Sequence, residues 1–161
     1  MSRRFADLRL ACPFSSPEEA RSLLERARTF GYKLVALPVG PEATREELQA
    51  LRAAADEVGI DLATRVDLAP GSREELLSAL RRLRKRFELI GVLCRSRDVA
   101  RVAARDRRVD LLLFPLRPKQ RFFDRSEAEL ASGSNCALEI PLMPLFRLPR
   151  AERIALLGRL R

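Results

Sequence analysis

Residues 44–68 read TREELQALRAAADEVGIDLATRVDL and contain one full unit of the pattern that decides the fold. The Thr-x-x-Glu motif at Thr44 and Glu47 is a capping box, which predicts that a helix begins here. Apolar residues recur at helical spacing up to Gly59, a residue suited to end the helix in the left-handed conformation. Residues 60–68 then predict a buried strand. This stretch is therefore a helix followed by a strand.

The same pattern recurs on both sides of this stretch. Upstream, strands are expected at 5–11 and 33–39, with a helix between them that begins at Ser16. Downstream, the expected strands are 88–94, 109–116 and 136–142, and the expected helices begin at Ser72, Ser96, Ser126 and Leu148. Six strand–helix units with strands that are apolar on both faces predict an α/β protein with a parallel sheet covered by helices.

Two parallel α/β architectures fit this unit, because right-handed crossovers build either a doubly wound sheet or a barrel. No glycine-rich phosphate loop follows the first strand, which weakens the nucleotide-binding doubly wound alternative. We therefore expect a single domain, residues 1–161, with a TIM-like (β/α) barrel. A closed eightfold barrel usually needs at least about 200 residues. The expected barrel is thus incomplete, with about six units and the last two absent.

Positive charge is concentrated in one segment of the chain. The 161 residues carry 31 basic and 22 acidic side chains, a net charge of +9, and residues 81–125 alone carry 15 basic and 5 acidic ones. A surface covered by ion-pair networks would instead have similar numbers of acidic and basic side chains in each segment. The excess indicates a polyanionic partner.

The barrel geometry sorts these cations into two sets. Binding sites on such a fold form on the loops that follow the strands. The candidates for RNA contact on that rim are Arg95, Arg97, Arg117, Lys119 and Arg121. A second set falls near the carboxyl ends of two helices, on the opposite rim: Arg81, Arg82, Arg84, Lys85, Arg86, Arg105, Arg107 and Arg108. It is either a solvated set of helix ends, which cations stabilise, or a second surface for RNA or for a protein subunit.

The absence of histidine removes most familiar catalytic and zinc sites, so an enzyme here would need carboxylates, lysine, cysteine or an active site supplied by a partner. A hard-metal site formed by Asp7, Asp67 and Glu139 is an alternative. The stronger expectation is that such strand carboxylates pair with arginines such as Arg9 or Arg65. The three cysteines are odd in number and widely spaced, which favours buried thiols over disulfides.

No apolar run approaches the roughly 18 residues of a membrane span, and the N-terminus lacks the apolar region of a signal peptide. We therefore expect a cytoplasmic protein.

Several motifs, taken in order, resemble a known family. Residues 107–115 read RRVDLLLFP, residues 123–124 read FD and precede a short helix, residues 135–140 read NCALEI, and residues 5–8 read FADL. This order and spacing resemble the thirty-kilodalton protein subunit of archaeal and eukaryotic ribonuclease P, archaeal protein component 3.

The resemblance implies a TIM-like barrel of the polymerase and histidinol phosphatase (PHP) type. Strand one of those metal hydrolases typically reads Asp-Leu-His-x-His, whereas residues 7–11 here read DLRLA, so both histidines are replaced. The resemblance further implies a non-catalytic subunit of the endonuclease that removes the 5′ leader of precursor tRNA. Its implied partners are the catalytic RNA, which would use Mg²⁺, the precursor tRNA, and other protein subunits including a small one.

Two alternatives stay open at this point. One is a stand-alone hydrolase that binds a metal through carboxylates on a PHP-like barrel. The other is a domain that binds RNA without sequence preference, for which binding would depend steeply on salt.

Overall fold

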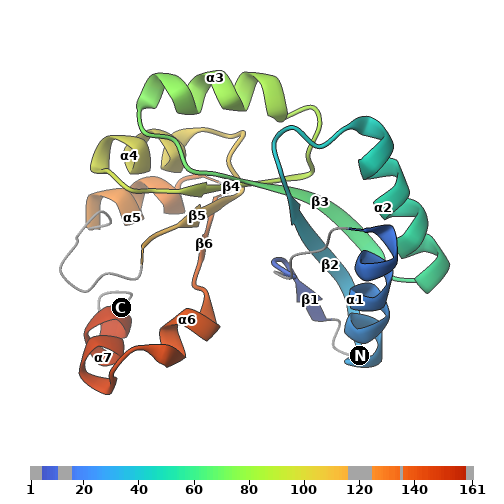
Figure 1. The fold of residues 1–161 in the computed structure, drawn as a ribbon. Coiled ribbons are helices and arrows are strands. Elements are labelled where there is room, and N and C mark those ends of the chain that lie inside the picture. Colours follow the sequence, from blue (N-terminus) through green and yellow to red (C-terminus); the bar gives the residue numbers. More distant parts are fainter. Residues whose placement is uncertain (1–4, 11–15, 116–124, 135, 159–161) are drawn as a thin grey trace. The chain divides into compact units, whose positions relative to one another are not determined.

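The computed structural model describes residues 5–10, 16–115, 125–134 and 136–158 of the chain (Figure 1). Strands and helices alternate from the N-terminus up to β6. The strands are β1 (Phe5–Asp7), β2 (Tyr32–Val39), β3 (Asp61–Leu68), β4 (Leu89–Leu93), β5 (Leu111–Leu113) and β6 (Ala137–Glu139). The helices are α1 (Pro17–Thr29), α2 (Arg45–Val58), α3 (Arg73–Leu83), α4 (Arg97–Arg105), α5 (Arg125–Ser132), α6 (Leu142–Arg147) and α7 (Arg150–Gly158).

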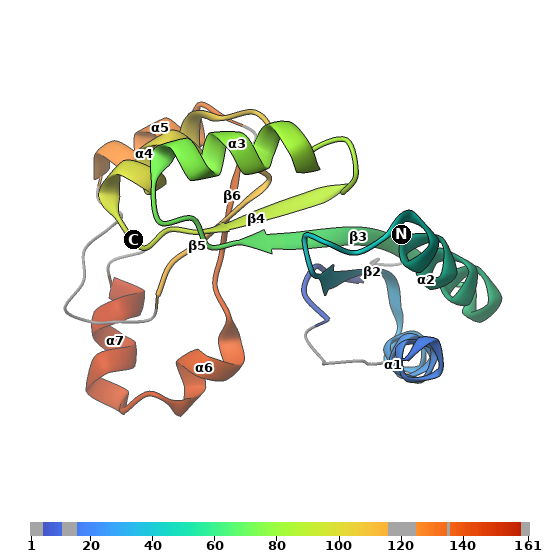
Figure 2. The same ribbon diagram turned by 45° about the horizontal axis from the view of Figure 1, so that its top comes forward.

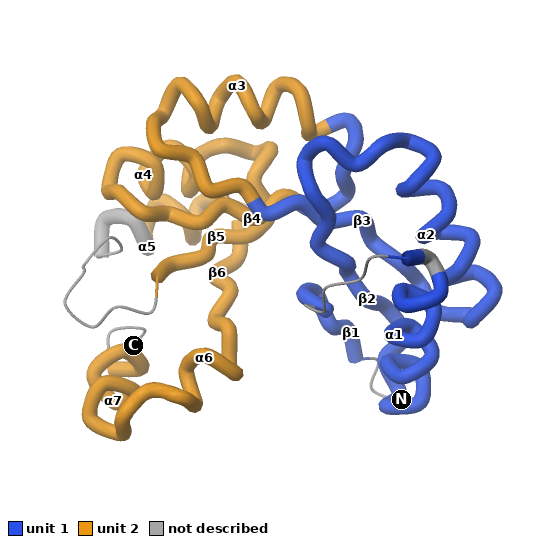
Figure 3. Tube along the Cα trace, in the orientation of Figure 1, with its two compact units in different colours: residues 1–67, 85–89 blue, residues 68–84, 90–161 orange. Residues whose placement is uncertain are grey.

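The chain forms two compact units (Figure 3). Unit 1 consists of residues 1–67 and 85–89, and unit 2 of residues 68–84 and 90–161. The expectation of one domain stays a prediction.

Within each unit the strands are parallel and follow one another in sequence order. In unit 1 the order is β1-β2-β3, with Leu34 opposite Asp61. In unit 2 it is β4-β5-β6, with Gly91, Leu111 and Ala137 in one row. A helix precedes each new strand, as parallel neighbours require. Neither unit contains the reversal of strand order that marks a doubly wound sheet, so the order is that of a (β/α) barrel.

The helices begin where the sequence predicts. Ser16, Thr44, Ser72 and Ser96 are N-caps, and the side-chain oxygen of each accepts a hydrogen bond from the backbone N–H three residues later. Thr44 and Glu47 form the complete capping box. At the other end of α2, Gly59 has a φ of 73°, a left-handed conformation that glycine adopts without steric cost. Local sequence therefore defines both ends of α2.

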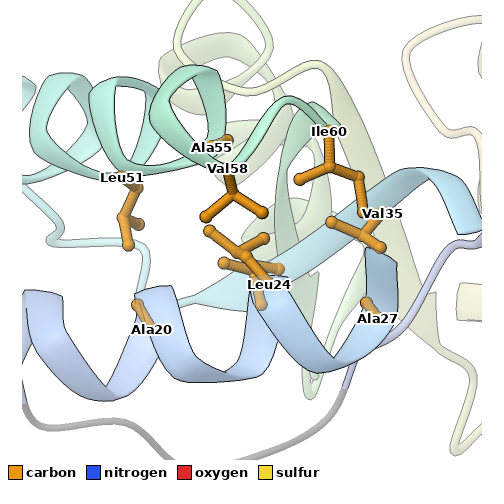
Figure 4. Close-up of a cluster of buried hydrophobic side chains, with 9 residues drawn as sticks. Ala20, Leu24, Ala27, Val35, Leu51, Ala55, Val58 and Ile60 are labelled. Atoms are coloured by element: carbon orange, nitrogen blue, oxygen red, sulfur yellow. The ribbon is translucent and has the colours of Figure 1, made fainter. Parts of the chain in front are cut away.

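The core of unit 1 lies between α1, α2 and the strands (Figure 4). Leu24 and Val35 are completely buried there. Around them pack Ala20, Ala27, Leu37, Leu51, Ala55, Val58 and Ile60. Each leucine buried in this way contributes roughly 1.5–3 kcal/mol relative to an exposed one. The apolar stripes that the sequence places on both helices therefore face each other.

In unit 2, α3, α4 and α5 lie next to one another on one side of β4, β5 and β6 (Figure 2). Leu76, Leu80 and Leu83 form the buried face of α3. The buried face of α4 consists of small residues, Val99, Ala100, Ala103 and Ala104, which allow close packing. The opposite face of α4 is left to solvent.

The end of the chain differs from the sequence prediction. The helix expected at 148–160 is α7, which begins at Arg150, but an additional helix, α6, was not expected, and Leu148 is extended between the two. Pro149 explains the break, since the residue before a proline is disfavoured in the helical region. Pro144, expected to help close the preceding strand, is the third residue of α6. Proline is tolerated there, because N–H groups in the first turn have no partner within the helix.

Candidate nucleic-acid interface

The loop after β4 carries the first two predicted RNA contacts. Arg95 follows the strand, Ser96 caps α4 by accepting from the N–H of Val99 at 3.3 Å, and Arg97 is the first helical residue. Both arginines are exposed. The cap holds them at the point where the chain leaves the sheet. The other three candidates, Arg117, Lys119 and Arg121, lie outside the described residues, as do Phe122 and Phe123.

The second predicted basic set separates into exposed and internally engaged side chains. Arg81 and Arg82 lie in the last turn of α3, and Arg105 ends α4. All three are exposed, as is Arg107 just beyond α4. These four cations belong to unit 2, on two helices that contact each other.

Two other members of this set hold the structure of unit 2 together. Arg84 caps the end of α3, forms an ion pair with Asp110, and donates to the backbone oxygen of Arg108 at 3.3 Å. Asp110 also accepts from the N–H of Ile90 at 2.8 Å. Arg84 thereby ties the end of α3 to the start of β5 and is not a free phosphate contact.

Arg108 is engaged in the same way. Its side chain pairs with Asp106 at 2.9 and 2.6 Å, and its backbone N–H donates to the same carboxylate at 3.0 Å. The side-chain hydrogen bonds from Arg108 lower the pKa of Asp106, and burial opposes them only in part. Asp106 is thus held ionised against its partner.

Lys85 and Arg86 belong to unit 1, so the eight cations are divided between the two units. The sequence placed them in the last turn of a helix, but α3 ends at Leu83. Arg86 donates to the backbone oxygens of Pro41 (3.2 Å) and Ala43, and lies 5.5 Å from the ring of Phe87. It fastens the loop after β2. Lys85 is exposed.

The sequence reasoning missed one arginine. Arg101 is exposed and lies four residues from both Arg97 and Arg105, so the three share one side of α4. The prediction considered only cations at the ends of strands and helices, and Arg101 lies in the middle of α4. The four-residue spacing was the signal that would have found it.

A cleft of about 650 Å³ lies at the carboxyl ends of α4 and α5. Its lining residues are Arg105, Arg107, Glu129, Leu130, Gly133 and Ser134. The turn after α5 is fixed by Ser134, whose hydroxyl donates to the oxygen of Ala131 at 2.9 Å and accepts from the N–H of Cys136 at 3.2 Å. The cleft therefore offers two guanidinium groups, one carboxylate and an apolar wall.

One strand carboxylate of unit 1, Asp67, pairs with Arg65 and Arg9, as the sequence predicts. Asp67 lies 2.7 Å from Arg65 and 3.4 Å from Arg9. Arg65 is completely buried and also donates to the backbone oxygen of Leu8 at 2.5 Å. Asp7 accepts from the backbone N–H of Arg9 at 2.9 Å. Two of the three carboxylates considered for a metal are thus engaged within unit 1, whereas Glu139 belongs to unit 2.

The described thiols are unsuited to nucleophilic chemistry at neutral pH. Burial raises the pKa of Cys94 to about 12, and burial together with nearby Asp110 raises that of Cys136 to about 12. Both are free cysteines. Because only the thiolate is nucleophilic, these side chains act as small hydrophobes. Cys12 lies outside the described residues.

Two features are absent from the described part of the chain. No three His, Cys, Asp or Glu side chains in it come together as a metal site. No helix in it has the length and apolar character needed to cross a bilayer.

These features define the chain as an α/β protein with an incomplete TIM-like barrel fold and exposed arginines on and next to two helices of unit 2 that contact each other. The chain belongs to the ribonuclease P subunit p30 family, whose model matches residues 4–161. None of the curated proteins matches the sequence.

A solved structure confirms the fold. The chain is similar to one in the cryo-EM structure of archaeal ribonuclease P with mature tRNA, at 19% identity and a TM-score of 0.77. The match covers 97% of this chain and 65% of the other. The chain thus spans 65% of the length of the protein that it matches, in agreement with the expected incomplete barrel.

Proposed function

We propose that this chain is a protein subunit of ribonuclease P, the ribonucleoprotein that removes the 5′ leader of precursor tRNA in the cytoplasm. The match of the family model to residues 4–161 carries the proposal. The similar chain comes from archaeal ribonuclease P with mature tRNA, which supports RNA, tRNA and other protein subunits as partners. A small protein subunit is one of the partners we propose.

The subunit acts on the RNA without carrying out the chemistry itself. A folded catalytic RNA brings many phosphates together, and cationic side chains reduce their repulsion. Arginine is suited to this, since its planar fork pairs with two phosphate oxygens at once. Arg95 and Arg97, with Arg117, Lys119 and Arg121, are the contacts we propose. The Mg²⁺ ions that activate water would be held by the RNA.

Reconstitution tests the proposal. Cleavage of precursor tRNA is measured with the cognate RNA and partner subunits over a range of Mg²⁺ concentrations, with and without this chain. We expect the chain to raise the cleavage rate at low Mg²⁺ and to lower the Mg²⁺ concentration that half-maximal activity requires. No change in either quantity would refute the proposal.

A matched pair of variants connects this activity to the loop after β4. Arg95→Gln/Arg97→Gln removes two charges there, and Arg147→Gln/Arg150→Gln removes two exposed charges on α6 and α7 of the same unit. The first is expected to need more Mg²⁺ than the second. A domain that binds RNA without preference would be equally sensitive to both, and would stimulate unrelated RNA as well.

A further inference from the structure

The exposed face of α4 joins the two basic regions that the sequence treated as separate. It begins with Arg97, continues through Arg101 and ends at Arg105, beside the cleft that Arg105 and Arg107 line. We infer that this face, here called the α4 track, binds the phosphate backbone of one RNA strand and leads it into the cleft. The inference rests on the proposed function and names the surface of unit 2 that the RNA follows.

The geometry of the track follows from the helix. Three arginines at four-residue intervals rise by about 6 Å per step and span about 12 Å in all. The opposite face of α4 is buried through Val99, Ala100, Ala103 and Ala104, which fixes the rotation of the helix in unit 2. The arginine side is thereby directed to solvent. It is a rigid surface, because α4 packs against both α3 and α5.

Charge favours a continuous polyanion as the occupant. Arg81 and Arg82 are exposed on α3, which contacts α4, so they add to the positive charge near the track. The positive potential is reduced at the two ends of the track, by the carboxylate of Asp98 at the first turn and by the negative end of the helix dipole at the last turn of α4. The phosphates of a nucleic acid strand are spaced at short, regular intervals, so a phosphate can pair with each arginine of the track. An acidic protein would need carboxylates placed at matching positions.

The cleft favours a ribonucleotide over a bare anion. Glu129 would repel a phosphate that lay against it, but its carboxylate can accept a hydrogen bond from a ribose 2′-hydroxyl. Arg105 and Arg107 supply the phosphate contact, and Leu130 supplies an apolar surface for the sugar or base. The 2′-hydroxyl is the group by which proteins distinguish RNA from DNA. The volume of about 650 Å³ is in the usual range for small-ligand sites.

Direct binding tests the track without the other subunits. The probe is a fluorescent single-stranded oligoribonucleotide of about ten nucleotides, titrated by anisotropy with the whole 161-residue chain at several salt concentrations. Arg101→Gln/Arg105→Gln is expected to weaken binding on the order of tenfold and to lower the slope of log affinity against log salt by about 1.4, or about 0.7 per lost phosphate contact. The control Arg147→Gln/Arg150→Gln removes the same charge from unit 2 and should change the slope by less than half as much.

Two further variants separate charge from geometry. Arg101→Lys/Arg105→Lys keeps both charges, so the salt slope should stay near that of the wild type while the loss of the forked guanidinium lowers affinity a few fold. Glu129→Gln should reduce the preference for RNA over DNA of the same sequence. If Glu129→Gln keeps the wild-type preference for RNA over DNA, the cleft does not bind a ribonucleotide. Thermal melts by circular dichroism show whether each variant is folded.

The track is overturned if folded Arg101→Gln/Arg105→Gln binds the oligonucleotide with the same affinity and salt slope as the control. It is also overturned if that variant binds RNA normally but no longer binds a partner subunit, which would make the surface a protein contact. A negative result for the track can be told apart from a negative result for the proposed function. If Arg101→Gln/Arg105→Gln binds RNA like the control, the track is wrong, but the wild-type chain can still stimulate cleavage of precursor tRNA. If the wild-type chain does not stimulate cleavage, the proposed function is wrong, but the oligonucleotide titrations still show whether the variants differ in RNA binding.

Discussion

Unit 1 and unit 2 differ in how deeply they bury the arginines that hold them together, because Arg65 of unit 1 is completely buried whereas Arg84 and Arg108 of unit 2 keep 33% and 32% of their side chains exposed. In unit 1, Arg65 is completely buried against Asp67, Arg52 pairs with Glu88 at 3.1 Å, and Arg86 donates to backbone oxygens of the loop after β2. Unit 2 pairs Arg84 and Arg108 internally in the same way. Its exposed arginines include seven on or next to α3 and α4: Arg81, Arg82, Arg95, Arg97, Arg101, Arg105 and Arg107.

This difference teaches that a count of cations does not by itself measure a binding surface. The guanidinium group makes five hydrogen bonds in a fixed plane, so a buried arginine organises the backbone around it. The same group on a helix exterior is exposed and accessible to a binding partner. Which of the two applies is decided by exposure and by nearby carboxylates.

The largest effect should come from the buried arginine of unit 1. Replacing Arg65 with Met removes its ion pair and its bond to Leu8, and leaves Asp67 with only the half-exposed Arg9. Breaking a buried pair by removing one partner costs roughly 3–5 kcal/mol, and the partial exposure of Asp67 places the expected loss near the lower end. Urea unfolding followed by circular dichroism measures it.

Arg52→Met is the matched control in the same unit. Arg52 and its partner Glu88 are 43% and 50% exposed, and exposed pairs contribute about 0–1 kcal/mol. If the two variants lose the same stability, then burial is not what distinguishes the inner arginines, and the contrast drawn above is wrong.

An intermediate effect is expected from the internal pair of unit 2, and it depends on pH. The folded-state pKa of Asp106 lies below the ordinary value of about 3.9, chiefly through the side-chain hydrogen bonds from Arg108. A depressed carboxyl pKa contributes stability that is fully present above the unfolded pKa and is lost as the pH falls through the folded pKa. Asp106→Asn should therefore lower stability at neutral pH, and its difference from the wild type should shrink between about pH 4 and pH 2.

Melting temperatures of the two proteins, measured in parallel across that range, give this difference directly. Other carboxylates titrate in both proteins and cancel in the comparison. A difference that stayed constant down to pH 2 would mean that the pair with Arg108 does not depend on the charge of Asp106.

The smallest effect on stability should come from the α4 track. Arg101 and Arg105 are exposed, and glutamine has nearly the same helix propensity as arginine, so Arg101→Gln/Arg105→Gln should stay within about 1 kcal/mol of the wild type. Most of the expected loss of stability comes from Arg105, since its positive charge complements the carboxyl end of the helix. A loss as large as that of Arg65→Met, measured by the same urea unfolding, would place these arginines among the structural ones.

The fold was predictable because its signals are local. Capping residues at Ser16, Thr44, Ser72 and Ser96 mark helix starts, and the continuous apolar strands between them indicate a parallel sheet. The end of the chain was less predictable. The Pro144 that was expected to end a strand lies in the first turn of α6, a position where proline is equally acceptable.

The candidate site was predictable only in part. The sequence placed Arg95 and Arg97 after a strand and paired Asp67 with arginines, both as observed. It could not show that Arg84 and Arg108 are engaged with Asp110 and Asp106, because such pairs depend on which loops come together in space. It also missed Arg101, since strand ends had been the only guide to position.

The order of the strands has a consequence for how the chain folds. The paired strand residues lie 20 to 28 positions apart in the sequence, as in Gly91 with Leu111 and Ala6 with Leu34, so the loops that must close are short. Proteins built from such local pairings fold faster than those with distant ones. During synthesis, which proceeds from the N-terminus, each new strand would find its neighbour already made. The chain can therefore add one strand at a time as it leaves the ribosome, and each new strand covers the edge left by the one before it.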